Sequence, residues 1–431
     1  MPTRFDPSGP LRGSLRPPPD KSISHRAALI AAMGEGETAI EGYLDAADTR
    51  STLAAVGALG AEVQGVHGDA MEQRLGVRGV GLRGAAAVAI DVGNAGTLLR
   101  LLPGWVAGQE TGTWTLDGDD SIRRRPVDRI ATPLGLMGAR VECRDDRLPP
   151  LRIDAAPLHG IEYELPVASA QIKSCLLFAG LLAEGETRIV EPLPSRDHSE
   201  RMLAAAGAEI VREDGAVTVR PAARLEPGEI VVPADFSSAA FFLAAALLVP
   251  GSDVSLTSIG LNPTRTGLLT ILERMGAQIE TEPEGERGGE PSGRVRVRAA
   301  RLRGTEVGGS DVPLAIDELP LVALAAFFAE GETTIRDAAE LRRKESDRIA
   351  TVAAALTALG ATVETSEDGM RIEGGGGLRG GAVESHGDHR IAMLGAVAGL
   401  ASNEGVEVVG MDAAAVSYPR FEADLASLIA G

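Results

Sequence analysis

The stretch "LRRKESDRIA" at residues 341–350 holds a carboxylate between fixed cations. Lys344 precedes Glu345, and Arg348 follows it one helical turn later. An acid in such surroundings could carry a proton for a reaction on an anionic ligand, because neighbouring charges tune its pKa. Asp317, at the start of a nearly uncharged segment, is a second candidate acid. The competing interpretations are a row of surface salt bridges for Glu345 and a helix N-cap for Asp317.

Lysine is rare in this chain. Lys21, Lys173 and Lys344 are the only lysines, although Lys and Arg together number 42. Lys21 and Lys173 fall in the first turns of expected buried helices, where a cation opposes the helix dipole. An anion in front of those turns would explain them, since free backbone N–H groups and a cation bind phosphate well. Ordinary N-capping by the small polar residues at these positions is the alternative.

A six-fold repeat organises the rest of the sequence. A turn followed by a short strand recurs near residues 34–40, 111–116, 184–190, 250–256, 330–335 and 404–409. An Ala- and Leu-rich segment of helix length precedes each strand, and an amphipathic segment follows it. Five of the amphipathic segments end in Gly-Ala, a helix stop followed by a strand. The pattern predicts an α/β protein built from β-α-β-α-β-β units, arranged as one six-membered ring or as two domains of three.

We expect two similar domains, because the Pro- and Glu-rich stretch "PAARLEPGE" (221–229) separates the third unit from the fourth. Units 1–3 would occupy residues 20–227. Units 4–6 would occupy residues 228–431, and residues 1–19 would supply the last strand of that second domain. The glycine run at 374–381 lacks the Lys-Ser/Thr of a phosphate loop and is expected to be a turn.

Composition excludes several classes of function. A formal net charge of -19 argues against binding nucleic acid or an anionic membrane through the general surface. Two cysteines make neither a disulfide framework nor a zinc motif. No apolar signal segment opens the chain, and no apolar run is long enough for a membrane span, so a cytoplasmic protein is expected. The "HGDH" stretch (386–389) resembles metal ligands, but no second cluster has the matching spacing, and no metal is expected.

Seven motifs in order resemble the 3-phosphoshikimate 1-carboxyvinyltransferase (EPSP synthase) family of enolpyruvyl transferases. They are "GNAGTLLR" (93–100), "RRRP" (123–126), "ASAQIKS" (168–174), "SRDHSER" (195–201), "AIDELP" (315–320), "RRKESDRI" (342–349) and "HGDHRIAM" (386–393). The resemblance runs from "PPPDKSISHR" to "SYPRF" (417–421). It implies two domains of three repeats, called inverted α/β barrels, with the active site in the cleft between them. It also implies transfer of the enolpyruvyl group of phosphoenolpyruvate to the 5-hydroxyl of shikimate 3-phosphate, without any cofactor, by a monomer.

The resemblance also assigns site residues. Asp317 would be the general base, Glu345 would move the proton at C3, and Lys344 would bridge the two substrates. Shikimate 3-phosphate would be held by Lys21, Ser22, Arg26, Ser169, Gln171, Ser195, Arg196, Asp317 and Lys344. Phosphoenolpyruvate would be held by Lys21, Asn94, Gly96, Arg125, Gln171, Arg348 and Arg390.

Some positions depart from the family pattern. Val416 stands where some members have a lysine, and Glu340 stands where some have asparagine. Gly96, which is often alanine in a divergent subgroup, predicts ordinary sensitivity to the herbicide glyphosate.

Three other functions remain as alternatives. The sister enzyme that acts on UDP-N-acetylglucosamine shares "RPVD" (125–128), but it usually has a reactive cysteine where this chain has Asp120. RNA 3'-phosphate cyclases have similar repeats, yet they need RNA contacts that an acidic chain disfavours. A non-catalytic protein that binds a phosphate ligand would not need Asp317, Lys344 and Glu345 together.

Overall fold

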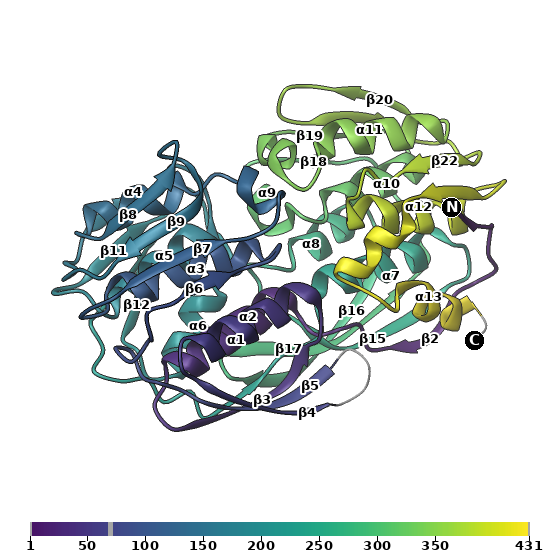
Figure 1. The fold of residues 1–431 in the computed structure, drawn as a ribbon. Coiled ribbons are helices and arrows are strands. Elements are labelled where there is room, and N and C mark those ends of the chain that lie inside the picture. Colours follow the sequence, from purple (N-terminus) through teal and green to yellow (C-terminus); the bar gives the residue numbers. More distant parts are fainter. Residues whose placement is uncertain (1, 68–71, 430–431) are drawn as a thin grey trace. The chain divides into compact units, whose positions relative to one another are not determined.

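The computed structural model describes residues 2–67 and 72–429 and divides the chain into two compact units (Figure 1). Unit 1 contains the described parts of residues 1–18, 234–285 and 291–431, and unit 2 contains those of residues 19–233 and 286–290. Two segments differ from the predicted domain ranges. Strand β14 (Glu229–Val231) belongs to unit 2 because it pairs in parallel with β3 (Glu37–Leu44). Residues 286–290, the tip of a hairpin, are also grouped with unit 2.

Unit 2 contains three repeats, each with a four-stranded sheet and two α-helices. The first repeat is α1 (Lys21–Met33), β3, α2 (Ala47–Ala58), β4 (Glu62–His67) and β5 (Glu72–Arg78), with β14 as its fourth strand. The second is β6 (Ala89–Asp91), α3 (Gly96–Ala107), β7 (Thr113–Asp117), the 3₁₀ helix η1 (Ile122–Arg124), α4 (Asp128–Leu136), β8 (Arg140–Arg144) and β9 (Leu148–Asp154). The third is β10 (Glu162–Glu164), α5 (Ala170–Gly180), β11 (Thr187–Val190), α6 (His198–Ala205), β12 (Ile210–Glu213) and β13 (Ala216–Val219).

Unit 1 also contains three repeats, and residues near both ends of the chain contribute strands or helices to them. Its first repeat is β2 (Arg12–Leu15), α7 (Phe236–Leu248), β15 (Asp253–Gly260), α8 (Gly267–Arg274), β16 (Gln278–Arg287) and β17 (Glu290–Arg298). The second is β18 (Glu306–Val307), α9 (Asp311–Ala315), α10 (Leu319–Phe328), β19 (Glu332–Ile335), η2 (Ala339–Arg343), α11 (Arg348–Ala358), β20 (Thr362–Thr365) and β21 (Met370–Glu373). The third is β22 (Gly381–Glu384), α12 (His389–Ala401), β23 (Val406–Val409), η3 (Met411–Val416) and α13 (Phe421–Ile429), with β1 (Thr3–Phe5) alongside β23.

The sheets share one pairing order. In the second repeat β6 runs parallel to β7, β7 is antiparallel to β9, and β9 is antiparallel to β8. The sixth repeat is an exception to the predicted unit, because only three strands, β1, β23 and β22, form its sheet among the described residues. The six sheets are separate, and each has two edge strands in the part of the chain that the structure describes.

Each repeat has one helix that is buried almost throughout. All residues of α7 are buried, and α7, α10 and α12 pack on one another in unit 1 (Figure 1). In unit 2, α3 packs on both α1 and α5. These helices consist mainly of Ala, Leu and Phe, which tolerate burial on every side and favour helix over strand at this length. Their N-terminal turns therefore have fixed positions in each unit.

The predicted Gly-Ala helix stops are confirmed. Gly60, Gly138, Gly207, Gly276 and Gly360 all have φ between 93° and 107°. This left-handed conformation is costly for residues with a Cβ atom, and it ends the helix so that the next strand can begin. No helix among the described residues is long and apolar enough to cross a lipid bilayer.

Candidate active site

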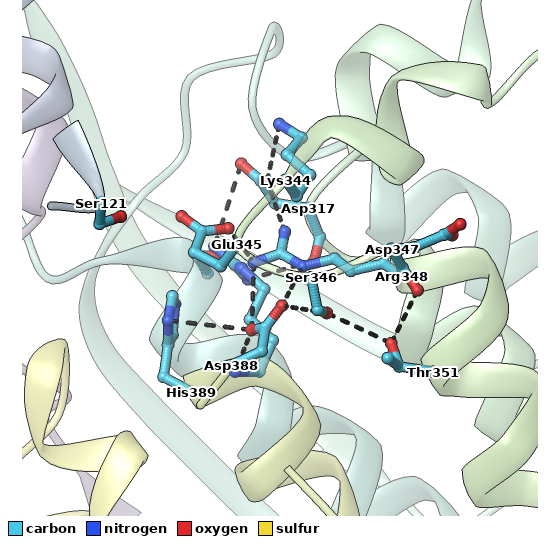
Figure 2. Close-up of polar contacts among 12 residues, drawn as sticks. Ser121, Asp317, Lys344, Glu345, Ser346, Asp347, Arg348, Thr351, Asp388 and His389 are labelled. Atoms are coloured by element: carbon cyan, nitrogen blue, oxygen red, sulfur yellow. Dashed lines mark hydrogen bonds and ion pairs between the residues drawn. The ribbon is translucent and has the colours of Figure 1, made fainter. Parts of the chain in front are cut away.

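Arg348 is the centre of a charged cluster in unit 1 (Figure 2). It is the first residue of α11, and its side chain is only 1% exposed. Its Nε donates to Asp388 Oδ2 at 2.9 Å, and its Nη2 donates to Glu345 Oε2 at 2.7 Å. A guanidinium buried against two carboxylates is a structural and electrostatic anchor, so "LRRKESDRIA" is not a row of solvated surface salt bridges.

Asp317 contacts Arg348 and a second cation of this cluster, Lys344. It lies in the turn between α9 and α10, and both Lys344 Nζ and Arg348 Nη1 lie 3.3 Å from its Oδ1 atom (Figure 2). Asp317 is therefore not the N-cap of α10, a position that Glu318 takes. Lys344 directly follows the end of η2, so this short 3₁₀ helix positions the Lys344 ammonium group beside the Asp317 carboxylate.

Arg390 approaches the same turn from α12. Its Nη1 donates to the backbone oxygen of Asp317 at 3.1 Å and to Glu318 Oε1 at 3.4 Å. Glu318 is fully buried and also accepts from Arg265 Nη1 at 2.8 Å. The turn that carries Asp317 is thus held on both sides by arginines.

The charges of the cluster fix the protonation of its acids. Burial alone would raise the pKa of Glu345, but Arg348, with His389 and Lys344, outweighs burial and holds this pKa below its usual range. The same balance of burial against Arg348 lowers the pKa of Asp388. Burial disfavours the charged form of Arg348, yet Glu345 and Asp388 raise its pKa above the ordinary value. Without ligand, Glu345 is a carboxylate that is partly open to solvent, with 37% of its side chain exposed.

A second cluster lies in unit 2, at the N-terminal ends of α3 and α5. Arg125 Nη2 donates to Asn94 Oδ1 at 2.9 Å, and Asn94 Nδ2 donates to Asp119 Oδ2 at 2.7 Å. Gly96 is the first residue of α3. A Cβ atom built there would lie 2.7 Å from Arg125 Nη1, so glycine permits the close approach of this guanidinium.

Gln171 connects α5 to this second cluster. Its Oε1 accepts from Arg100 Nη1 at 3.1 Å, and its Nε2 lies 3.4 Å from Thr97 Oγ1. Ser169 is the N-cap of α5, where its hydroxyl accepts from the backbone N–H of Ile172 at 3.4 Å. The N-terminal turns of α3 and α5 thus present arginine, amide and hydroxyl groups together, a chemistry suited to anions.

The first turns of α1 show two different environments. Lys21 Nζ lies 3.2 Å from Asp48 Oδ2, with 27% of the lysine side chain exposed, and Ser22 is half-buried. Arg26 is instead buried at 3% exposure, and it donates to Ser199 Oγ at 2.8 Å and Ser174 Oγ at 2.9 Å. Burial lowers the pKa of Arg26 to about 10, although Glu200 opposes that change.

The loop between β11 and α6 carries Ser195 and Arg196. Ser195 is buried and its hydroxyl donates to Glu191 Oε1 at 2.5 Å, whereas Arg196 is half-buried and its charge contributes to the lowered pKa of Arg26. Lys173 differs from its predicted environment, because it is 1% exposed and paired with buried carboxylates rather than directed at a ligand.

Comparison with known proteins decides the family. The model of the EPSP synthase family (3-phosphoshikimate 1-carboxyvinyltransferase) matches residues 5–425. The chain belongs to the EPSP synthase family. The resemblance found from the seven motifs is therefore confirmed, and the match spans every segment that carries a candidate site residue of this family member.

Individual proteins of known name are similar to this chain over nearly its whole length. A 3-phosphoshikimate 1-carboxyvinyltransferase of Alkalilimnicola ehrlichii is 50% identical over 418 residues, which cover 96% of this chain and 93% of that protein. One from Synechococcus sp. (strain JA-3-3Ab) is 49% identical over 430 residues, covering 99% and 96%. The 2.37 Å structure of EPSP synthase from Acinetobacter baumannii has a TM-score of 0.89 at 40% identity, covering 99% of this chain and 97% of that one. The enolpyruvyl transferase NikO from Streptomyces tendae shares the fold, with a TM-score of 0.78 at 18% identity.

Several residues in these clusters were missing from the sequence-based assignment for this EPSP synthase family chain, among them Arg100 and Asp388. Arg100 lies one turn after Gly96 on α3, so the i to i+4 spacing within "GNAGTLLR" was the available signal. Asp388 lies in "HGDHR", where it caps α12 by accepting from Arg390 N at 2.9 Å and pairs with Arg348. Across residues 2–67 and 72–429 no group of three or more His, Cys, Asp or Glu is placed to hold a metal ion. In the "HGDH" segment, Asp388 pairs with Arg348.

Proposed function

We propose that this chain transfers the enolpyruvyl group of phosphoenolpyruvate to the 5-hydroxyl of shikimate 3-phosphate. The products are phosphate and 5-enolpyruvylshikimate 3-phosphate. One observation carries the proposal, namely that the match to the family model spans residues 5–425. The charged clusters in unit 1 and unit 2 agree with it, because both substrates are polyanions and the clusters offer arginine, lysine and hydroxyl groups.

The proposed division of the binding residues follows the family resemblance. Shikimate 3-phosphate is assigned to Lys21, Ser22, Arg26, Ser169, Gln171, Ser195 and Arg196 of unit 2 and to Asp317 and Lys344 of unit 1. Phosphoenolpyruvate is assigned to Lys21, Asn94, Gly96, Arg125 and Gln171 of unit 2 and to Arg348 and Arg390 of unit 1. The contact between Arg125 and Asn94 and the position of Gln171 beside Arg100 support this assignment, since these groups converge on adjacent helix N-termini.

In the addition step Asp317 accepts the proton of the 5-hydroxyl while the oxygen bonds to C2 of phosphoenolpyruvate. The electron pair of the C2–C3 double bond takes up a proton at C3, which gives a tetrahedral intermediate. Lys344 and Arg348, each 3.3 Å from Asp317 Oδ1, place positive charge beside the carboxylate that is proposed as the base. We assign to Lys344 the neutralisation of anionic groups of both substrates, a role that suits a compact ammonium.

Glu345 is the proposed carrier of the proton at C3. Its pKa is low in the ligand-free protein because Arg348 lies against it. When the anionic groups of phosphoenolpyruvate share the charge of Arg348, the pKa of Glu345 must rise, and the acid can take and deliver a proton. The second step removes a proton from C3 and expels phosphate from C2, which restores the double bond.

Release of phosphate from phosphoenolpyruvate tests the reaction and its acceptor. We expect turnover with shikimate 3-phosphate and none with UDP-N-acetylglucosamine at the same concentration. A reaction with phosphoenolpyruvate and no acceptor gives the background rate of phosphate release. Turnover with the sugar nucleotide alone would identify the chain as the sister transferase, and binding without turnover would identify a phosphate-ligand binding protein. The assignment of a monomer stays a prediction, which light scattering of the purified chain measures.

A further inference from the structure

Lys173 occupies a closed ionic cluster inside unit 2. Its Nζ atom lies 2.7 Å from Glu200 Oε1 on α6, 2.9 Å from Glu191 Oε2, and 3.4 Å from the backbone oxygen of Ser195. Only 1% of its side chain is exposed. One compact ammonium therefore serves three acceptors from two different segments, a role that fits lysine better than a planar guanidinium.

Glu191 transmits this contact to the loop between β11 and α6. While its Oε2 atom pairs with Lys173, its Oε1 atom accepts from the Ser195 hydroxyl at 2.5 Å and from the Ser195 N–H at 3.2 Å. Lys173, Glu191 and Ser195 thus form a ring of hydrogen bonds, which fixes the backbone and the side chain of Ser195 relative to α5.

Glu200 belongs to the cluster but does not reach the loop by any contact that the structure records. Its side chain is fully buried, and its recorded partner there is Lys173. Burial raises the pKa of Glu200, and the charge of Lys173 opposes that rise. Glu191 and Glu200 therefore share one cation but differ in what they hold, which makes them a matched pair for an experiment.

We infer that Lys173 is a positioning residue for the binding of shikimate 3-phosphate, acting through Glu191 on the loop that carries Ser195 and Arg196. This inference rests on the proposed function, because it takes Ser195 and Arg196 as ligands of that substrate. Lys173 itself contacts no substrate. It holds the loop in the binding geometry before the substrate arrives, which lowers the entropy lost on binding.

The test compares Lys173→Met, Glu191→Ala and Glu200→Gln with the unchanged chain. Calorimetry measures the dissociation constant of shikimate 3-phosphate, and steady-state kinetics measures kcat and both KM values. For Lys173→Met and Glu191→Ala we expect the dissociation constant and KM of shikimate 3-phosphate to rise about ten- to hundredfold, the range of one charge-assisted hydrogen bond. We expect kcat and the KM for phosphoenolpyruvate to stay within about threefold. For Glu200→Gln the affinity should fall less than for Glu191→Ala, because Glu200 has no recorded contact with the loop, although its charge acts on the proposed ligand Arg26.

The outcomes separate positioning from mere stability. A purely structural role would lower the folded fraction and kcat while leaving the dissociation constant unchanged, and that result for Lys173→Met and Glu191→Ala would overturn the inference. If Lys173→Met does not fold, Glu191→Ala decides alone, since Glu191 lies in the loop and its side chain is 10% exposed. Failure of the unchanged chain to bind shikimate 3-phosphate would overturn the proposed function and this inference with it.

Discussion

At the scale of single residues, two acids that share one cation differ in their exposure to solvent. Glu345 and Asp388 both pair with Arg348, yet Asp388 is fully buried and caps α12, whereas Glu345 keeps 37% of its side chain exposed. Asp388 is therefore suited to hold Arg348 in place. Glu345 is the acid of this pair that solvent reaches, which fits its proposed role as the proton carrier.

Replacing Glu345 by Gln should reduce kcat about 10²- to 10⁴-fold, the usual contribution of a general acid or base. Binding of shikimate 3-phosphate, measured by calorimetry, should change little, because Glu345 is not among its proposed ligands. Glu340→Gln is the matched control, since Glu340 is a half-buried acid in η2 whose recorded partner is the exposed Arg343. A Glu345→Gln variant within a few-fold of the unchanged chain would remove Glu345 from the mechanism.

The lowered pKa of Glu345 also gives a dependence of stability on pH. Its folded pKa lies below the unfolded value of about 4.3, so the unfolded chain binds the proton first as pH falls. The group therefore adds stability above about pH 4.3, and this stability is lost as the pH falls through that value towards the folded pKa. The difference in melting temperature between the unchanged chain and Glu345→Gln, measured from pH 7 to pH 3, should accordingly become smaller below about pH 4.3.

At the scale of elements, the starts of the six buried helices combine capping with anion chemistry. Side chains cap four of them, namely Asp20 for α1, Ser169 for α5, Asp235 for α7 and Asp388 for α12. Helices α3 and α10 begin without a side-chain cap. The capping interpretation of the sequence is thus correct for four helices. At the start of α3, which has no side-chain cap, Gly96 leaves room for the guanidinium of Arg125.

Replacing Gly96 by Ala should displace Arg125, because the new Cβ atom would lie 2.7 Å from its Nη1 atom. We expect the KM for phosphoenolpyruvate to rise several-fold, with a smaller change in kcat, and inhibition by glyphosate to weaken. Gly57→Ala in α2 is the control, since a Cβ atom there meets nothing within 4 Å. That control should keep both kinetic constants and gain about 0.4–1 kcal/mol of unfolding free energy. An unchanged KM for Gly96→Ala would contradict the assignment of Gly96 and Arg125.

At the scale of the whole molecule, each unit is completed by a strand from a distant part of the chain. Strand β14 joins the first repeat of unit 2, while β1 and β2 join repeats of unit 1. The chain therefore crosses between the units near Pro18 and near Pro233, and the hairpin tip at residues 286–290 is also grouped with unit 2. Paired crossings leave each unit with its own complete core and allow the units to move as bodies.

Binding of shikimate 3-phosphate should make the molecule more compact, because its proposed ligands belong to both units. Small-angle scattering with and without this substrate measures the change as a smaller radius of gyration. Shikimate without the phosphate group is the control, and it should produce less compaction at the same concentration. An unchanged radius at saturating shikimate 3-phosphate would contradict the prediction.

Local signals made part of this protein readable from its sequence. The six turn-and-strand segments, the buried Ala- and Leu-rich helices and the five Gly-Ala helix stops were all predictable, because each depends on residues close together in the chain. Membership of the family was also readable, since its motifs are short and keep their order.

Contacts between distant residues decided the remainder. The sequence could not tell that Lys173 pairs with Glu191 and Glu200, or that Asp388 holds Arg348 across 40 positions. Residues 1–19 were expected to supply the last strand of the second domain, but only the structure shows that residues 3–5 join the sixth sheet beside β23. A first-turn lysine looks the same in sequence whether it faces a ligand or a buried carboxylate. Only the packing of α5 and α6 around Lys173 determines which of these partners it meets.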